Sequence, residues 1–357
     1  MTKLLVIDDS ALMRRLVGAA FAAEADFTLE FAGDGAAALE QARRFLPDVV
    51  TLDVNMPRMD GLACLDQMML ERPCPVVMLS ALTEAGADVT LEALQLGAVD
   101  FIAKPSGAIS LAMESFGPLL VDRVRAAARS RVRRSLRLAD RVRMQAGMPP
   151  QQTTRAAPVR LAGGAGPTDG VLLVGCSTGG PPALDALLSP LPAEFPWPVL
   201  VAQHMPASFT GPLARRLNRL CALEVVEVTR PLPLRRGQVY IGRGDADLVL
   251  AQRPGGVMVM AVPAATEFRW HPSVDRMVDS ALRCLAPSRL VGVLMTGMGD
   301  DGAAAMTRLH HAGGRTIAEA ESTAVVWGMP GELVRAEGAG AVLPLDAIPR
   351  QLLAWVP

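Results

Sequence analysis

Val171-Leu-Leu-Val-Gly-Cys-Ser-Thr-Gly-Gly-Pro-Pro182 is the stretch from which the rest of this chain can be interpreted. Four apolar residues end abruptly in small residues, and two prolines then open a helical pattern, which predicts a strand, a sharp turn and a helix. The stretch contains the pattern G-x-S-x-G around Ser177, typical of a serine hydroxyl exposed at the carboxyl end of a strand. A glycine-rich turn of this kind also suits phosphate binding or tight packing. Residues elsewhere in the sequence are needed to decide among these three interpretations.

The composition predicts a soluble protein of two domains. The chain has 357 residues, of which 50% are hydrophobic, yet no apolar run reaches the ~18 residues of a membrane span. The amino terminus lacks the small-residue cleavage site of a signal peptide. The five cysteines are odd in number and scattered, which indicates reduced thiols in a cytoplasmic protein. A net charge of −1 argues against a general nucleic-acid binder.

Residues 1–118 alternate short apolar runs with helical patterns, which predicts a parallel sheet with helices on both faces. The expected strands are Leu4–Ile7, Thr28–Ala32, Val49–Leu52, Val76–Leu79 and Phe101–Ala103. Polar residues follow four of them, namely Asp8, Asp9, Asp53, Ser80 and Lys104. Functional groups collect at the carboxyl ends of strands in such sheets. Three converging carboxylates suit Mg²⁺, and one of them could accept a phosphoryl group.

These motifs resemble a response-regulator receiver domain, through Ile7-Asp-Asp-Ser10, Leu52-Asp-Val-Asn-Met-Pro-Arg-Met-Asp-Gly61, Ser80-Ala81 and Lys104-Pro105. The resemblance implies a flavodoxin-like (βα)5 fold. It implies that Asp53 is the phospho-acceptor and that Ser80 and Lys104 are the switch residues. It also implies that Asp8, Asp9 and the backbone carbonyl of Asn55 bind Mg²⁺, and that the Lys104–Pro105 peptide is cis.

Residues 119–165 are expected to form a linker. Nine arginines crowd its first part, at positions 123, 125, 129, 131, 133, 134, 137, 141 and 143. A basic amphipathic helix could bind nucleic acid, an anionic membrane or an acidic partner. A solvated helix that extends the last receiver helix is the favoured interpretation. The following segments rich in proline and glycine, Met148–Pro158 and Gly163–Pro167, predict a flexible tether.

Residues 166–357 are expected to form a doubly wound, mainly parallel α/β domain. Besides the strand before Ser177, apolar runs at Val199–Ala202 and Leu290–Met295 precede His204 and Asp301. A serine, a histidine and an aspartate that each follow a strand can converge as nucleophile, general base and orienting carboxylate. Their order along the chain differs from that of α/β-hydrolases, so that fold is not expected.

The second half resembles the catalytic domain of the chemotaxis protein-glutamate methylesterases, the CheB family. The matching segments are Gly175–Gly180, Gln203–Pro206 with Phe209-Thr210, Pro272–Asp275, Thr296–Gly302, Gly313–Ala318 and Ser322–Gly331. The resemblance implies Ser177 as nucleophile, His204 as base and Asp301 as the third member. It places the oxyanion donors at backbone N–H groups near Thr178 and Met298.

Several competitors for these roles are less favoured. Cys176 is intrinsically reactive, but strand alternation turns its side chain away from Ser177. His271 is a second candidate base, although no strand delivers it to the turn. Asp300 is the neighbour of Asp301, and the motif favours Asp301. The remaining histidines, His310 and His311, are expected to close a helix.

The resemblance implies a phosphorylation-activated, cytoplasmic and monomeric esterase that hydrolyses glutamate methyl esters on methyl-accepting chemotaxis receptors. It also implies deamidation of receptor glutamines at the same site. A chemotaxis histidine kinase would supply the phosphoryl group, with Mg²⁺ in the receiver and no cofactor for the esterase chemistry, while the unphosphorylated receiver covers the site. Two other hypotheses remain, a receiver with a nucleic-acid-binding arginine-rich output and an inactive domain that acts only as a scaffold.

Overall fold

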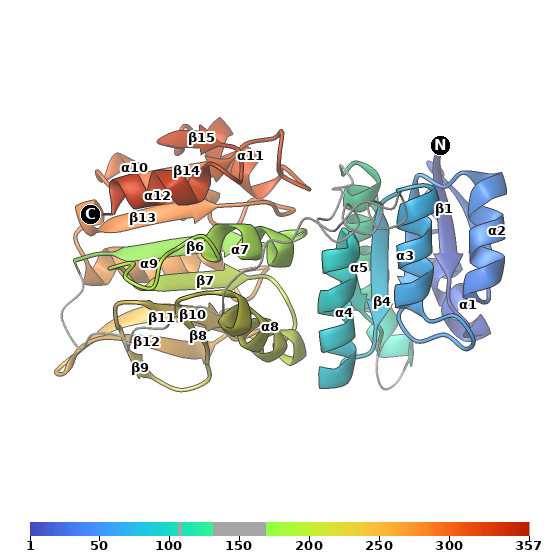
Figure 1. Ribbon diagram of the computed structural model, residues 1–357, viewed down its shortest axis with the longest axis horizontal. Coiled ribbons are helices and arrows are strands. Elements are labelled where there is room, and N and C mark those ends of the chain that lie inside the picture. The colour runs from blue at the N-terminus through green and yellow to red at the C-terminus, as the bar shows by residue number, and fades with distance from the viewer. Residues whose placement is uncertain (106–108, 131–168, 357) are drawn as a thin grey trace, which may run out of the picture. The chain divides into compact units, whose positions relative to one another are not determined.

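The structure is a computed structural model, and it describes residues 1–105, 109–130 and 169–356. The chain divides into two compact units, Met1–Thr154 and Arg155–Pro357 (Figure 1). The expected tether and the linker arginines from Arg131 onward lie outside the described residues. The expected domain boundaries stay predictions.

The first unit is a five-stranded parallel sheet with the strand order β2-β1-β3-β4-β5. Its elements are β1 (Thr2–Ile7), α1 (Ala11–Ala20), β2 (Phe27–Ala32), α2 (Gly35–Phe45), β3 (Val49–Asp53), α3 (Gly61–Glu71), β4 (Val76–Ser80), α4 (Glu84–Leu96), β5 (Asp100–Ala103) and α5 (Ile109–Ala128). Helix α1 contacts α5, while α3 contacts both α2 and α4. This strand order is that of flavodoxin-like folds, so the predicted fold class of this half is confirmed.

Local sequence explains where the helices begin. Four of them start after a side chain that accepts a hydrogen bond from the third helical N–H, which satisfies an otherwise unpaired donor. These caps are Ser10 for α1, Asp34 for α2, Asp60 for α3 and Thr83 for α4. The strands between the helices are buried runs, and every residue of β3 and β4 is buried.

Helix α5 continues past residue 118, where the first domain was expected to end, and reaches Ala128. Two of the linker arginines lie on this helix and make ion pairs within the first unit. Arg123 binds Asp100 at 2.5 Å, and Arg125 binds Glu24 at 2.7 Å and Asp26 at 3.0 Å. The extension of the helix agrees with the favoured interpretation, but Arg123 is not solvated, since its side chain is 11% exposed and pairs with the buried Asp100.

The second unit has a seven-stranded parallel sheet with the order β15-β14-β13-β6-β7-β10-β8. Its strands are β6 (Val171–Cys176), β7 (Val199–Gln203), β8 (Glu224–Val228), β10 (Gln238–Gly242), β13 (Leu290–Leu294), β14 (Arg315–Glu319) and β15 (Ala341–Leu343). The helices are α7 (Gly180–Leu188), α8 (Ala207–Leu220), α9 (Val274–Cys284), η1 (Pro287–Arg289), α10 (Ala303–His311), α11 (Met329–Arg335) and α12 (Ile348–Trp355). The predicted mainly parallel α/β fold is confirmed.

A second, three-stranded antiparallel sheet joins this unit and was not predicted. It consists of β9 (Leu232–Pro233), β11 (Ala246–Arg253) and β12 (Gly256–Pro263) in the order β11-β12-β9. Strand β11 packs against α9, where Leu250 N–H donates to the Ser280 hydroxyl at 2.9 Å. This small sheet therefore supports a helix that begins at the candidate site. Within the described ranges, no helix is both long enough and apolar enough to cross a membrane.

Candidate functional site

The carboxyl ends of β1, β3 and β5 gather the charged residues of the first unit. The Lys104 ammonium lies 2.8 Å from Asp8 Oδ2 and 2.8 Å from Asp53 Oδ2. Asp9 stands on the exposed side of this group, and carboxylate oxygens of Asp8, Asp9 and Asp53 lie within 4.8 Å of one another. Asn55 N–H donates to Asp53 Oδ1 at 3.2 Å.

The electrostatics of this cluster suit a divalent cation. Burial raises the pKa of Asp53, the Lys104 ammonium opposes that change, and the Asp8 charge adds to it. The pKa of Lys104 is raised, because its bonds to the two carboxylates outweigh burial. Three clustered carboxylates facing one ammonium leave excess negative charge, and oxygen ligands are those that Mg²⁺ prefers. The donor set therefore fits Mg²⁺.

Ser80 lies next to Lys104 in the sheet, since Ser80 pairs with Ala103 across β4 and β5. Its hydroxyl accepts from Thr90 at 2.8 Å and donates to Gly86 O at 3.3 Å, and among the described residues it makes no hydrogen bond to Asp53 or to the Lys104 ammonium. The expectation of a cis peptide before Pro105 is wrong for this structure. Among the described residues the cis peptide is His271–Pro272.

The three predicted esterase residues follow three adjacent strands of the second sheet. Strand β6 ends before Ser177, its neighbour β7 ends before His204, and β13 on the other side leads to Asp301. Cys176 pairs with Gln203 across β6 and β7, which places Ser177 and His204 side by side. The chain passes from β6 to β7 on one side and later returns to β13 on the other. The site thus lies at the switch point, where open α/β sheets place their ligands.

His204 and Asp301 are in direct contact, with His204 Nε2 at 2.8 Å from Asp301 Oδ2. Three more donors reach the same carboxylate, namely Ser273 Oγ at 3.0 Å, Val274 N–H at 2.7 Å and Asp275 N–H at 3.0 Å. The two amides belong to the first turn of α9, where the helix dipole favours a negative charge. Burial raises the pKa of Asp301, but these hydrogen bonds and the His204 charge outweigh it, so the pKa is lowered.

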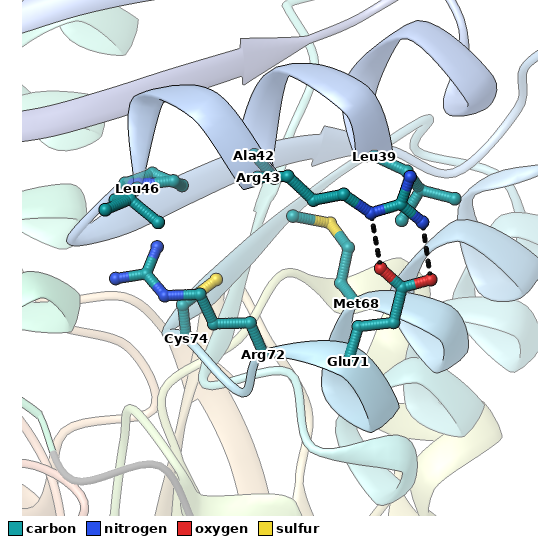
Figure 2. Close-up of a pocket in the computed structure, with 9 residues that line it drawn as sticks. Leu39, Ala42, Arg43, Leu46, Met68, Glu71, Arg72 and Cys74 are labelled. Atoms are coloured by element: carbon teal, nitrogen blue, oxygen red, sulfur yellow. Dashed lines mark hydrogen bonds and ion pairs between the residues drawn. The ribbon is translucent and has the colours of Figure 1, made fainter.

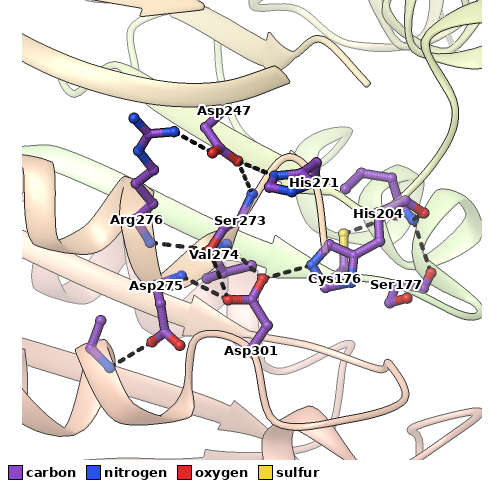
Figure 3. Close-up of polar contacts among 12 residues, drawn as sticks. Cys176, Ser177, His204, Asp247, His271, Ser273, Val274, Asp275, Arg276 and Asp301 are labelled. Carbon is purple, nitrogen blue, oxygen red and sulfur yellow. Dashed lines mark hydrogen bonds and ion pairs between the residues drawn. The ribbon is translucent and has the colours of Figure 1, made fainter. Parts of the chain in front are cut away.

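This contact determines which nitrogen of His204 can act as a base. A carboxylate accepts, so Nε2 carries the proton and Nδ1 keeps its lone pair. Nδ1 is buried and has no partner among the described residues, and no hydrogen bond joins it to Ser177 Oγ. Figure 3 shows the His204 ring between Asp301 and Ser177. Catalytic hydrogen bonds often form only when the substrate is bound, so this arrangement is compatible with a base poised beside the serine.

The turn around Ser177 is held close to the loop after β13. Ser177 N–H donates to Thr296 O at 2.9 Å, and Gly180 N–H donates to Ser177 O at 2.8 Å. A Cβ added at Gly297 would lie 2.9 Å from Ser177 Cβ, so only glycine permits this approach. Met298 N–H, one of the two expected oxyanion donors, donates to no residue that the structure describes. The other, at Thr178, belongs to a fully buried residue of the same turn.

Gln203 links the two reactive turns, and sequence reasoning assigned it no role. Its Nε2 donates to Ser177 O at 3.0 Å and to His204 O at 3.2 Å. Its Oε1 accepts from the Cys176 thiol at 3.0 Å. A Cβ at Gly180 would lie 1.8 Å from that oxygen. The sequence feature that could have identified Gln203 as a functional residue is its position, one residue before His204.

Trp270 was also missed. Its ring stacks on His204, with centroids 5.7 Å apart and an angle of 14° between the planes. The neighbouring motif Pro272–Asp275 was part of the family resemblance, but no role was assigned to it. Its residues supply three of the hydrogen-bond donors to Asp301.

The competing residues lie in other settings. Cys176 is fully buried against Gln203, and burial raises the pKa of its thiol far above the usual range. His271 binds Asp247 through Nδ1 at 2.8 Å. Asp300 is exposed, and it is Asp301 that contacts His204. His310 lies in the last turn of α10, with Nδ1 at 3.4 Å from the Thr316 hydroxyl.

A separate pocket in the first unit lies between α2 and α3, crossed by the ion pair of Arg43 and Glu71 at 2.8 Å (Figure 2). Its lining includes none of the predicted site residues.

Comparisons with known proteins agree with both halves of this description. The family model described as CheB methylesterase matches residues 172–352, and the model of the response regulator receiver domain matches residues 4–114. A protein of Rhodopseudomonas palustris, named protein-glutamate methylesterase/protein-glutamine glutaminase 2, is 57% identical and covers 99% of this chain and 98% of its own. A protein of Rhodospirillum rubrum, which carries the same name with the number 3, is 52% identical over 100% of this chain and 96% of its own.

Among solved structures, the CheB methylesterase catalytic domain of Thermotoga maritima is 36% identical with a TM-score of 0.51. It covers 55% of this chain and 100% of its own. The matches extend over both units. The chain therefore belongs to the CheB methylesterase family and carries a response regulator receiver domain ahead of the methylesterase domain.

Proposed function

We propose that this chain is a phosphorylation-regulated protein-glutamate methylesterase that also deamidates protein glutamines. The observation that carries the proposal is the contact of His204 with Asp301 beside the Ser177 turn, in a member of this family. The substrates are methyl-accepting chemotaxis receptors, and the phosphoryl donor is a chemotaxis histidine kinase. The enzyme acts as a cytoplasmic monomer.

In the first step, Ser177 Oγ attacks the carbonyl carbon of a glutamate methyl ester and His204 Nδ1 takes the hydroxyl proton. The resulting imidazolium is stabilised by Asp301, which the α9 amides keep ionised. The developing oxyanion accepts hydrogen bonds from the backbone N–H groups of Thr178 and Met298. Such donors lower the barrier because they are fixed before the reaction begins.

In the second step, His204 returns its proton to the leaving methoxide, and methanol departs. Water then attacks the acyl-enzyme with His204 again as base, which releases glutamate and restores Ser177. With a glutamine side chain, the leaving group is ammonia and the remaining steps are the same. The esterase chemistry uses no cofactor.

In the receiver, Asp53 accepts the phosphoryl group, while Asp8, Asp9 and the Asn55 carbonyl hold Mg²⁺. Bound there, Mg²⁺ would neutralise negative charge on the phosphoryl oxygens and so reduce their repulsion of the attacking Asp53 carboxylate. Lys104, already between Asp8 and Asp53, binds a phosphoryl oxygen, and Ser80 leaves its contact with Thr90 to bind another. The unphosphorylated receiver restrains the esterase, and phosphorylation shifts that equilibrium by a few kcal/mol.

Methanol release from methylated receptors tests this proposal. The wild-type chain releases methanol, and release increases when a small phosphodonor and Mg²⁺ are added. Ser177→Ala abolishes release while Asp53 is still phosphorylated. Asp53→Asn keeps the basal rate and loses the response to the donor. Undiminished release by Ser177→Ala would overturn the nucleophile assignment.

A further inference from the structure

A second buried carboxylate, Asp247, binds residues next to the His204–Asp301 pair and has no role in the proposed reaction. It stands near the start of β11 and is 1% exposed. Burial of an ionised carboxylate is costly unless hydrogen bonds and opposite charges compensate it. Asp247 has that compensation, and every group that supplies it comes from one continuous stretch of chain.

Four donors reach Asp247. Its Oδ1 accepts from His271 Nδ1 at 2.8 Å and from Ser273 N–H at 2.8 Å, and its Oδ2 accepts from Arg276 Nη1 at 2.5 Å and from Ala265 N–H at 3.2 Å. Burial raises the pKa of Asp247, but these bonds outweigh it and the pKa is lowered. The carboxylate thereby fixes the connection between β12 and α9 at its start, at its end and in the first turn of the helix.

The same connection and the first turn of α9 supply the ring that stacks on His204 and three of the donors that bind Asp301. Trp270 stacks on the imidazole, and the hydroxyl of Ser273 and the N–H groups of Val274 and Asp275 bind the carboxylate. Ser273 belongs to both arrangements, since its N–H binds Asp247 and its hydroxyl binds Asp301. Figure 3 shows the two carboxylates on opposite sides of Ser273.

We infer that Asp247 is a positioning residue for the His204–Asp301 pair, acting through the segment from Trp270 to Arg276. The inference rests on the proposed function of that pair. Among the described residues, Asp247 makes no hydrogen bond or ion pair with His204 or Asp301. His271 is a donor that holds this carboxylate, and it is not a second base.

Asp247→Asn is the sharpest test, because the side chain keeps its size while one oxygen becomes a donor. That amide would face another donor, either Arg276 or Ser273. The connection then loosens. Outer hydrogen-bond partners of metal-ligating residues are worth about 10- to 100-fold in activity, and we expect a loss of similar size here. We expect kcat for methanol release to fall by that factor with KM within about twofold, since Asp247 touches no substrate. Asp279→Asn, on the same helix but bound to Arg308, is the matched control and keeps the wild-type values.

A second measurement does not need esterase activity. A protonated imidazole quenches a stacked indole, so the pH-dependent fluorescence of Trp270 reports the protonation of His204. The signal is obtained as the difference between the full chain and its Trp270→Phe variant. His204 faces Asp301 and the indole, and Arg269 lies over the same indole at 4.9 Å. In Asp247→Asn the midpoint moves to lower pH, because a displaced Asp301 stabilises the imidazolium less.

His271 provides the variants that remain informative if Asp247→Asn fails to fold. His271→Gln keeps a side-chain donor for Asp247 and retains most of the activity, whereas His271→Ala lowers kcat and shifts the fluorescence midpoint in the same direction as Asp247→Asn. Wild-type kcat and an unshifted midpoint in Asp247→Asn or His271→Ala would overturn the inference. Loss of activity in His271→Gln equal to that in His204→Gln would overturn it too. If the wild-type chain releases no methanol, the proposed function fails, while the fluorescence midpoints still decide the role of Asp247.

Discussion

His204 and Asp301 lie 97 residues apart in the chain, and their side chains meet at 2.8 Å above the edge of the sheet. Strands β7 and β13 that deliver them are not neighbours, because β6 lies between them and ends at Ser177. The base and its orienting carboxylate therefore approach each other from opposite sides of the nucleophile's strand. The Asp301 carboxylate is fixed at the start of α9, so the position of His204 depends on where that helix begins.

Replacement of Asp301 by asparagine removes the charge that selects the His204 tautomer. We expect kcat for methanol release to fall by about 10⁴-fold, as for other orienting carboxylates. Asp300→Asn is the control, because Asp300 is adjacent but exposed, and it keeps the wild-type kcat. A loss confined to Asp300→Asn would reverse the assignment of the two aspartates.

Asp301 also makes the methylesterase domain sensitive to acid. Its pKa is lower in the folded protein than in the unfolded chain, so its ionised form contributes stability above the unfolded value of about 4. That stability is lost as the pH falls through the folded pKa. The midpoint of thermal unfolding should therefore differ most between wild type and Asp301→Asn at neutral pH, and the difference should shrink below about pH 4. A difference independent of pH would contradict this linkage.

The sequence predicted the features that short stretches encode. The alternating apolar and helical patterns gave both parallel sheets, because strand and helix periodicities are local. The polar residues after these strands, such as Asp53 and Ser177, could be placed together because parallel strands end at the same edge. The roles assigned to them came from the family resemblance, and those roles stay proposals.

The sequence could not reveal contacts that depend on tertiary packing. Gln203 is adjacent to His204 in the chain, but only the register of β6 and β7 places its amide at the Ser177 carbonyl. Asp247 has no motif around it, and its partners follow it by 18 to 29 residues. The antiparallel sheet that carries Asp247 includes two strands of eight residues, β11 and β12, but most residues of β12 are only partly buried and no motif marks the end of either strand.

Asp53 is expected to destabilise the receiver while it is ionised. Its folded pKa is raised, so its protonated form contributes stability that is present at low pH and lost as the pH rises through the folded pKa. Asp53→Asn resembles the protonated state and should raise the midpoint of the receiver's unfolding transition by a few degrees at pH 7. Saturating Mg²⁺ should raise the wild-type midpoint as well, and a chelator should reverse this and stop phosphorylation. A lower midpoint in Asp53→Asn at pH 7 would show that the bond to Lys104 dominates.

Cys176 can be excluded as the nucleophile by a variant that removes its sulfur. Cys176→Ala should keep kcat within a few-fold, because the thiol is buried and its raised pKa leaves it protonated at neutral pH. Thiol alkylation of the native wild-type chain should leave methanol release unchanged for the same reason. If Cys176→Ala loses as much activity as Ser177→Ala, the thiol is required for the reaction.

The clamp that Gln203 forms between the Ser177 and His204 turns should be required for both stability and rate. Gln203→Leu leaves the buried His204 carbonyl without its donor, which costs about 1–3 kcal/mol for the unsatisfied group, and it removes one of the two donors to Ser177 O. Gly180→Ala should damage the same clamp from the other side, because its Cβ would overlap the Gln203 amide. Gly255→Ala is the matched control, since a Cβ there meets nothing within 4 Å. The free energy of unfolding and kcat should fall together in the first two variants and remain unchanged in the third. Wild-type kcat in Gln203→Leu would mean that the two turns hold their positions without the clamp.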